Sequence, residues 1–353
     1  MITCLTDFDL RLRNTFRIPS RARLWIEFDA ADDIPAVAEK CNATTDPVLI
    51  IGAGSDILFT EEVFPGSVIH SSILTVEMET LPYHQVRITA GSGITMDELV
   101  ERTCIAGLWG MENLSGIPGE VGASAVQNVG AYGCEASDLI ESVYAYDILK
   151  RRFIVLYNDD CNFGYRYSVF KSPEARGRYI IASVTYILST IPNLRLNYGN
   201  LSAMVGSSNP TPLEIRQAVI ATRNAKLPDP AVTGSAGSYF TNPIVTPDQF
   251  AAVEAKARER LGADTAVPHF NLPDGRIKIP AAWLIDHAGL KGVREGGAGT
   301  WPTQPLVIAN ISGNCTARDV IKLEQRITDT VSDIFGIQLG LEVEKAPASL
   351  PLY

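Results

Sequence analysis

The stretch Val48–Phe59 reads VLIIGAGSDILF and is the starting point for interpreting the chain. Its first four residues form a continuous apolar run, which is typical of a strand buried on both faces of a sheet. Gly52 and Gly54 end that run in a turn whose main-chain amides could hold a pyrophosphate. An ordinary Rossmann domain is disfavoured because Ile57 stands where the third glycine of its fingerprint belongs. Taken alone, the segment is equally compatible with a plain tight turn.

The same strand-turn-helix order recurs further along the chain. Alternating Val86, Ile88 and Ala90 predict a strand, and Thr95 with Glu98 predicts a capped helix that ends near Gly107. More helices are expected over 32–41, 211–226 and 316–336, and more strands over 143–146, 153–156, 179–187 and 336–344.

Gly107–Gly133 reads GLWGMENLSGIPGEVGASAVQNVGAYG and contains too much glycine for regular secondary structure. The large apolar side chains within it argue against a flexible linker. A long loop of this kind is uncommon unless it binds something. We therefore expect a ligand-binding loop system here.

The bulk properties exclude several function classes. A length of 353 residues predicts two or three domains, and a net charge of -10 argues against general affinity for nucleic acid or anionic membranes. No stretch approaches 18 apolar residues, and Met1–Arg13 lacks the apolar core of a signal peptide. The six cysteines show no CxxC spacing, so we expect reduced thiols in the cytoplasm and no metal centre. Oligomeric state is not indicated.

Several longer segments, taken together, resemble one family in the same order along nearly the whole chain. They are the GAGSD turn, Glu112–Gly133, Phe163–Lys171 (FGYRYSVFK) and Lys226–Pro243 (KLPDPAVTGSAGSYFTNP), with Asn14–Ile18 (NTFRI) and Ala281–Gly292 (AAWLIDHAGLKG). The family is UDP-N-acetylenolpyruvoylglucosamine reductase. Leu196–Leu201 (LNYGNL) further resembles the subclass that carries a tyrosine loop over the substrate.

The resemblance implies an α+β chain with an FAD-binding fold of the vanillyl-alcohol-oxidase (PCMH) type in two subdomains, plus a smaller α/β substrate-binding domain. The expected FAD-binding domain spans residues 1–226, with its two subdomains divided near residue 70. The substrate-binding domain is expected over 227–315. A C-terminal helix and strand, 316–353, are expected to return to the first subdomain.

The implied cofactors are FAD and, as hydride donor, NADPH. FAD is expected to be noncovalent because the GAGSD turn contains no histidine to bond it. The implied FAD-binding residues are Ile51, Gly52, Ala53, Gly54, Ser55, Asp56, Gly116, Ile117, Pro118, Gly119, Gly122, Gln127, Asn128, Gly130, Ala131 and Tyr132.

Three residues match the family's catalytic set: Arg166, Ser238 and Glu344. A hydride that reaches the enolpyruvyl carbon pushes charge into the neighbouring carboxylate, which a fixed guanidinium can stabilise. Ser238 would protonate the adjacent carbon, and Glu344 would hydrogen-bond in the carboxylate region if it is protonated or bridged. Without the motifs, these would be a surface cation, a turn residue and a solvated charge.

Some assignments stay open or point to structural roles. Glu342 is the alternative acid to Glu344, because side chains two residues apart share a strand face. Glu120, Ala125 and Val343 depart from the family's pattern. Asp286 and His287 resemble an acid-base pair, but Trp283 and its apolar neighbours favour a packed helix.

For the substrate, the resemblance points to Tyr165, Tyr198, Lys226 and Asn242. The implied reaction is NADPH-dependent reduction of a nucleotide-sugar enolpyruvyl ether in peptidoglycan precursor synthesis. Two alternatives remain from the residues: an FAD oxidase of the same wider fold, and a flavin- or nucleotide-binding protein without catalysis.

Overall fold

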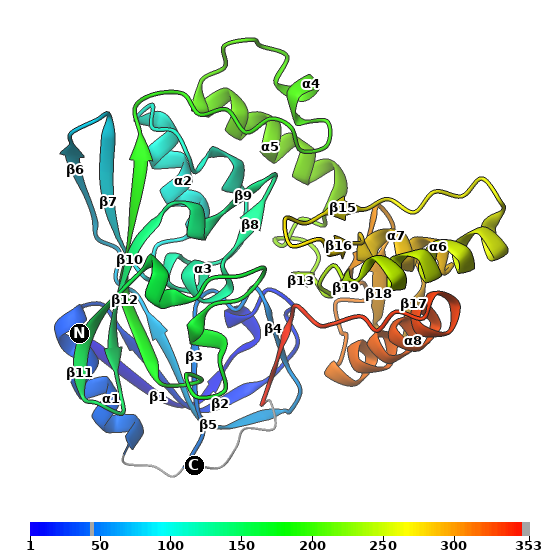
Figure 1. The fold of residues 1–353 in the computed structure, drawn as a ribbon. Helices are drawn as coiled ribbons and strands as arrows, with labels where there is room; N and C mark the ends of the chain where they lie inside the picture. The colour runs from blue at the N-terminus through cyan, green and yellow to red at the C-terminus, as the bar shows by residue number, and fades with distance from the viewer. Residues whose placement is uncertain (43–45, 348–353) are drawn as a thin grey trace.

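The computed structural model describes residues 1–42 and 46–347, which form three lobes. Two of them, built from the first two-thirds of the chain, lie against each other, and the third lies to one side of both (Figure 1). Among the described residues, none of the helices combines the length and apolar character needed to span a bilayer.

The first lobe is a four-stranded sheet in the order β1-β2-β5-β3, with one helix. Its elements are β1 (Ile2–Asp9), β2 (Arg21–Phe28), α1 (Ile34–Asn42), β3 (Val48–Ile51) and β5 (Val63–Ser71). The strand predicted from VLII is confirmed, and it pairs parallel with β5. Apolar residues of α1 and β2 share a core with Tyr146 and Ile180 of the second lobe, so the two lobes are fixed to each other.

The second lobe is a five-stranded antiparallel sheet in the order β11-β10-β12-β7-β6, with α3 packed against β12 and α5 packed on α2. Its strands are β6 (Val76–Leu81), β7 (Gln85–Gly91), β10 (Ile140–Asp147), β11 (Arg152–Tyr157) and β12 (Tyr179–Ser189). Its helices are α2 (Met96–Ile105), α3 (Val121–Gln127), α4 (Leu201–Val205) and α5 (Pro212–Lys226). Arg216 of α5 donates from Nη2 to Asp97 Oδ2 of α2 at 3.0 Å, which joins those two helices.

The glycine-rich segment was expected to lack regular structure, but the seven residues VGASAVQ within it form helix α3. Its small side chains allow it to pack closely on the end of β7. A Cβ added to Gly122 would lie 2.8 Å from Cβ of Ser92, so glycine is required at that contact. The glycines here serve close packing as well as loop geometry.

The predicted helix starts are confirmed at three threonines. The Thr95 hydroxyl accepts from the Glu98 amide at 3.3 Å. Thr211 and Thr316 each complete a reciprocal capping box, with Glu214 and Asp319 respectively. These contacts satisfy amides that no preceding turn can reach.

The third lobe combines two small sheets with three helices. The sheets have the orders β13-β19-β18-β17 and β14-β16-β15. The strands are β13 (Ser235–Ser238), β14 (Ile244–Val245), β15 (Phe270–Asn271), β16 (Ile277–Lys278), β17 (Arg294–Glu295), β18 (Ala298–Trp301) and β19 (Gln304–Asn310). The helices are α6 (Pro247–Leu261), α7 (Ala281–His287) and α8 (Ala317–Phe335). His287 stacks on Trp283 with ring centroids 4.0 Å apart, in line with the structural role expected for it.

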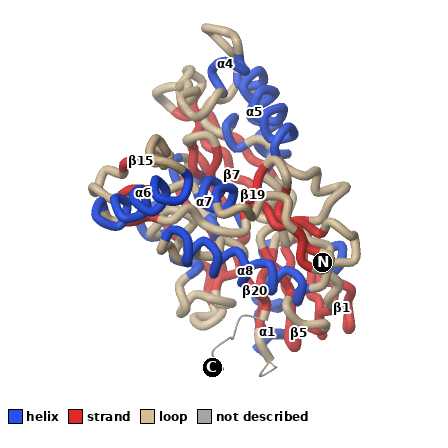
Figure 2. The backbone as a smooth tube through the Cα atoms, turned by 90° about the vertical axis from the view of Figure 1, so that its right-hand side faces the viewer, coloured by secondary structure: helices blue, strands red, loops and turns tan. Residues whose placement is uncertain are grey.

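Helix α8 packs on α6, α7 and the third lobe's sheet (Figure 2), whereas the C-terminal helix was expected to return to the first subdomain. Its apolar stripe, which includes Leu323 and Ile327, is fully buried in the third lobe's core. That burial holds the helix in place.

The strand predicted over 336–344 is much shorter and lies later in the chain. Only β20 (Glu344–Ala346) is a strand, and it pairs parallel with β4 (Ile57–Phe59) of the first lobe. Just before it, Leu341 forms an antiparallel bridge with Phe240 of the third lobe. We call Gly340–Ala346 the strap, because it connects the two lobes.

Replacing Leu323 by alanine is expected to destabilise the protein by about 2–5 kcal/mol, because a fully buried side chain leaves a cavity. Urea unfolding followed by circular dichroism measures the change. The matched control is Lys322→Ala, an exposed position on the same helix, which should stay within about 0.5 kcal/mol of the parent. Equal effects of the two variants would contradict the placement of α8.

Candidate active site

A cavity of about 510 Å³ lies where the first two lobes meet the strap. It is lined by β3, the turn 52–56, the start of α3, parts of 170–181 and the strap. Of the residues expected to bind FAD, Ile51–Asp56, Gly122 and Gln127 line this cavity.

The turn 52–56 forms a cradle of free amides in the cavity wall. Gly54 has φ +62°, and a Cβ placed there would lie 2.2 Å from the Arg13 carbonyl oxygen, so only glycine fits. The amides of residues 53–56 donate no hydrogen bond to any described residue. Because main-chain donors inside a protein normally find acceptors, these unpaired amides suit an anionic ligand group such as a pyrophosphate.

The predicted residues of the second glycine loop surround this cradle without lining the cavity. The Ser55 hydroxyl donates to the Pro118 carbonyl at 3.1 Å, which places Pro118 and Gly119 beside the cradle. Gly116, next to Ile117, donates its amide to Asp97 Oδ1 at 2.5 Å on the side of α2.

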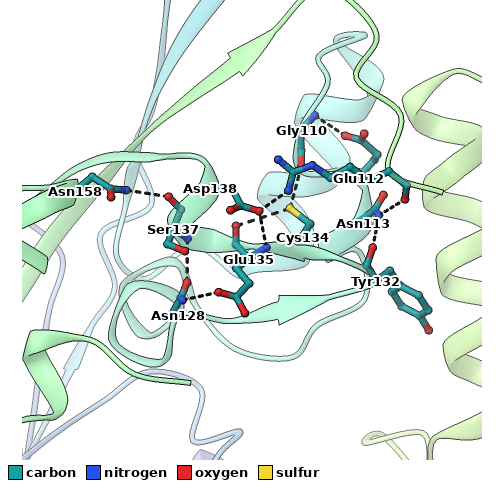
Figure 3. Close-up of polar contacts among 11 residues, drawn as sticks. Gly110, Glu112, Asn113, Asn128, Tyr132, Cys134, Glu135, Ser137, Asp138 and Asn158 are labelled. Atoms are coloured by element: carbon teal, nitrogen blue, oxygen red, sulfur yellow. Dashed lines mark hydrogen bonds and ion pairs between the residues drawn. The ribbon is translucent and has the colours of Figure 1, made fainter. Parts of the chain in front are cut away.

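Of the last four predicted FAD residues, Asn128 and Tyr132 belong to a polar network around a short hairpin (Figure 3). Gly130 and Ala131 form the first strand of that hairpin, β8 (Gly130–Ala131), which pairs with β9 (Cys134–Glu135). Asn128 Nδ2 donates to Glu135 Oε2 at 3.0 Å and to the Gly164 carbonyl at 2.9 Å. Its Oδ1 accepts from the Ser137 amide at 2.9 Å. These contacts occupy the Asn128 amide group, which therefore fixes the loop geometry.

A chain of charged and polar groups runs along the cavity wall. Gln127 donates from Nε2 to Asp56 and accepts from the Lys171 ammonium group. Lys171 Nζ also lies 3.4 Å from Glu344 Oε1. Burial, together with the nearby Glu342 carboxylate, raises the pKa of Asp56 well above its usual range. Lys171 is the last residue of the motif FGYRYSVFK, and this position in a family motif is the feature of the sequence that could have identified it as a site residue.

Arg166 is held from several sides. Its main chain has φ +55°, its Nε donates to Glu342 Oε1 at 2.7 Å, and its Nη2 donates to the Gly130 carbonyl at 2.8 Å. The guanidinium carbon lies 5.1 Å from the centroid of the Tyr165 ring. Nη1 has no partner among the described residues, so one edge of the guanidinium is available to a ligand.

The strap brings the remaining predicted catalytic residues to this region. The Glu342 amide donates to the Tyr239 carbonyl, and the Glu344 amide donates to the Asp56 carbonyl, both at 3.0 Å. Ser238 therefore lies one residue from a strap contact, and its hydroxyl has no partner in the described part of the chain. The Glu342 side chain is 14% exposed and that of Glu344 is 42% exposed. Burial raises the pKa of Glu342, although Arg166 opposes that effect.

The predicted substrate residues separate into a connected pair and two more exposed positions. Asn242 Nδ2 donates to the Tyr165 hydroxyl at 3.1 Å, and its Oδ1 accepts from the Ala281 amide at the start of α7. Tyr198 is half exposed. Lys226 is exposed at the end of α5, where its carbonyl accepts from the Thr303 hydroxyl at 2.7 Å.

Two residues of the third lobe were missed from the sequence. The Phe270 ring stacks with Tyr198 at a centroid distance of 6.4 Å, and Lys278 Nζ lies 4.9 Å from the Tyr165 ring centroid and 5.6 Å from that of Phe270. Each sits in a two-residue strand outside the quoted motifs, so no local pattern marked them. Together they extend the site from Arg166 towards the tyrosine loop.

Comparison with known proteins identifies the family. The family model for the C-terminal domain of UDP-N-acetylenolpyruvoylglucosamine reductase matches residues 229–346, and that for an FAD binding domain matches 22–149. The UDP-N-acetylenolpyruvoylglucosamine reductase of Chromobacterium violaceum is 40% identical over 95% of this chain and 97% of its own length. That of Neisseria meningitidis serogroup B is 40% identical over 98% of each chain.

A solved UDP-N-acetylenolpyruvylglucosamine reductase from Thermus caldophilus superposes with a TM-score of 0.67, at 23% identity and over 98% of both chains. With the FAD-binding match, this confirms the expected fold class, an FAD-binding α+β fold of the vanillyl-alcohol-oxidase type with an additional smaller domain. The chain therefore belongs to the UDP-N-acetylenolpyruvoylglucosamine reductase family.

Proposed function

We propose that this enzyme reduces UDP-N-acetylglucosamine enolpyruvate to UDP-N-acetylmuramate with NADPH, and that the reaction takes place at the strap, between the cavity and the third lobe. The proposed catalytic residues are Arg166, Ser238 and Glu344. Family membership makes the chain an FAD-containing oxidoreductase of peptidoglycan precursor synthesis. The observation that carries the placement is the strap itself, whose main chain contacts both the FAD-binding lobe and the residue after Ser238.

The cavity fits FAD. Its unpaired amides at 53–56 suit a pyrophosphate, and the apolar side chains of β3 and Ile180 supply the apolar surroundings that a ring system needs. When bound, FAD supplies the two-electron carrier that connects NADPH to the enolpyruvyl substrate.

Arg166 is proposed to bind the enolpyruvyl carboxylate. Reduction at the terminal carbon moves charge into that carboxylate, and a guanidinium stabilises it without changing its own protonation state. The salt bridge to Glu342 and the bond to the Gly130 carbonyl hold the group rigid before the substrate arrives. Preorganisation of this kind lowers the cost of stabilising charge during the reaction.

Ser238 is proposed to protonate the carbon next to the carboxylate. It follows Gly237, whose φ of +69° turns the chain at the end of β13. Since its hydroxyl is not engaged by any described residue, it is free to donate to a substrate carbon. A carbon that bears the charge of an enediolate is basic enough for a well-placed hydroxyl to serve as acid.

The two strap carboxylates are proposed to differ in role. Glu342 is paired with Arg166 and acts as a positioning residue for it. Glu344 is more exposed, lies 3.4 Å from Lys171 and is proposed as the group that hydrogen-bonds in the carboxylate region. Tyr165, Asn242, Tyr198 and Lys226 are proposed to hold the nucleotide-sugar part of the substrate.

We also propose that the enzyme acts in the cytoplasm. Cys4, Cys104, Cys134, Cys161 and Cys315 have free thiols, four of them buried, as is usual for proteins of a reducing compartment.

Ser238→Ala is expected to slow the substrate half-reaction by about 10²–10⁴-fold, the usual contribution of a general acid, while NADPH still reduces the flavin at the parent rate. Stopped-flow absorbance separates the bleaching by NADPH from the recolouring by substrate. Ser235→Ala, on the same strand, is the control and should change neither step. Equal slowing of both half-reactions by Ser238→Ala would give Ser238 a structural role instead.

Glu344→Gln is expected to reduce the rate of the substrate half-reaction, whereas Glu342→Gln is expected mainly to raise KM, because it loosens Arg166 without removing it. Steady-state kinetics of both variants, with substrate varied, makes the comparison. The reverse pattern would transfer the acid role to Glu342.

Gly54→Ala is expected to lose FAD, because a methyl group would overlap the Arg13 carbonyl and distort the cradle. The ratio of flavin to protein absorbance in purified material measures the loss. Gly133→Ala is the matched control: its φ of +79° gives similar strain, about 1–2 kcal/mol, but no atom lies within 4 Å of the new methyl group. Full FAD content in Gly54→Ala would refute the cradle.

A further inference from the structure

A buried histidine–carboxylate pair lies beside the amide cradle. His70 at the end of β5 and Glu120 just before α3 join through Nε2 and Oε1 at 3.0 Å, and their side chains are 8% and 10% exposed. The indole of Trp25 stacks on the imidazole with centroids 5.5 Å apart and an interplanar angle of 23°. The pair is therefore held in one geometry, and none of the roles given above uses it.

One acceptor atom of the pair, Oε2 of Glu120, lies on the side of the cavity. Glu120 lines the cavity, and its Oε2 has no partner among the described residues. A Cβ built on Gly52 would lie 3.1 Å from this Oε2, so the oxygen is in contact with the start of the cradle. This oxygen is not one of the fully buried side-chain atoms without a partner, so it is accessible from the cavity, where a carboxylate oxygen can accept a hydrogen bond from a ligand donor.

The charged groups near His70 and Glu120 are Glu27 and Arg13. His70 Nδ1 lies 3.7 Å from Glu27 Oε2 without a hydrogen bond, and Glu27 accepts from Arg13 at 3.1 Å and from Ser72 at 2.8 Å. Arg13, His70 and Glu27 are the charged or titratable groups that act on Glu120. Burial raises the pKa of Glu120 above its usual value, while the hydrogen bond with His70 opposes that effect.

We propose that Glu120 is an FAD-binding residue of this chain: its Oε2 accepts a hydrogen bond from a hydroxyl group of FAD, and His70 positions it through Oε1. A carboxylate beside a pyrophosphate cradle would repel the phosphates, but sugar hydroxyls flank the pyrophosphate of FAD on both sides. One set belongs to the ribityl chain and the other to the ribose. The inference rests on FAD binding, which is part of the proposed function.

The first test is the affinity of the holoenzyme for FAD, measured from flavin fluorescence on serial dilution. Glu120→Gln keeps the shape and the bond to His70 but presents an NH₂ group where the acceptor was. FAD is expected to bind about tenfold more weakly, as for loss of a charge-assisted hydrogen bond. Unchanged or tighter binding would overturn the proposal, and tighter binding would mean that the carboxylate had opposed the phosphates.

Competition of ADP and of riboflavin with FAD distinguishes a contact to the ribose from a contact to the ribityl chain, and both from a general structural effect. ADP carries the pyrophosphate and ribose, whereas riboflavin carries the ribityl chain, and the concentration of each that displaces FAD from the holoenzyme is measured for the parent and for Glu120→Gln. A ribose contact weakens ADP alone in Glu120→Gln, and a ribityl contact weakens riboflavin alone. Equal weakening of both competitors would indicate a distorted cavity and would overturn the proposal.

The pH dependence supplies a readout that distortion alone does not move. As pH falls through the raised pKa of Glu120, the parent is expected to lose FAD affinity because its acceptor becomes protonated, whereas Glu120→Gln should lose that component. Identical pH profiles would overturn the proposal.

The matched control is Glu112→Gln, which should match the parent in both affinity and pH profile. Glu112 is a buried carboxylate in the same glycine-rich segment, away from the cavity lining, whose Oε2 accepts from the Gly110 amide at 2.6 Å (Figure 3). If the parent itself binds no FAD, the proposed function fails; if only the Glu120→Gln effect is absent, this inference fails alone.

Discussion

The site depends on the main-chain contacts of the strap. Within three residues, the amide of Glu342 bonds the third lobe at Tyr239 and the amide of Glu344 bonds the first lobe at Asp56, which is nearly the whole chain away in sequence. These bonds fix the third lobe against the FAD cavity. Side chains then alternate: Glu342 and Glu344 reach Arg166 and Lys171, whereas Val343 enters the third lobe's core. One short segment thereby sets both the lobe arrangement and the position of two carboxylates.

Arg166 and Lys171 each contact several polar or charged groups near the strap, and the charges of the cavity and its ligands explain this arrangement. Near the strap, the carboxylates of Asp56, Glu342 and Glu344 lie close to the cations Arg166 and Lys171; Glu120 also lines the cavity, and Lys345 of the strap pairs with Glu324. FAD and the enolpyruvyl substrate are both anionic. Main-chain amides, which add no net charge, can hold phosphates in such surroundings without competing for the two cations. Arg166 and Lys171 then remain available near the strap, where charge develops during the reaction.

Local chemistry could be predicted from the sequence, but long-range pairing could not. The caps at Thr211 and Thr316 and the strand at Val48–Ile51 follow from neighbouring residues, and the structure has them. The family motifs named the turn 52–56 and Arg166. Contacts such as Arg166 with Glu342, 176 positions apart, have no local signal, because nothing near either residue specifies the partner. The strand expected over 336–344 was too long because apolar alternation continues through a segment that forms one isolated bridge at Leu341 and a strand ladder at β20.

The departure at Val343 follows from the same alternation. The amides of residues 342 and 344 donate the two strap hydrogen bonds, whereas the amide of Val343 donates none within the described residues. Proline at position 343 would therefore remove no hydrogen bond, and either residue would bury an apolar side chain in the core. At position 342 or 344 the same exchange would remove a bond that joins two lobes. The strap thus constrains residues 342 and 344 through main-chain hydrogen bonds, whereas Val343 is constrained through packing.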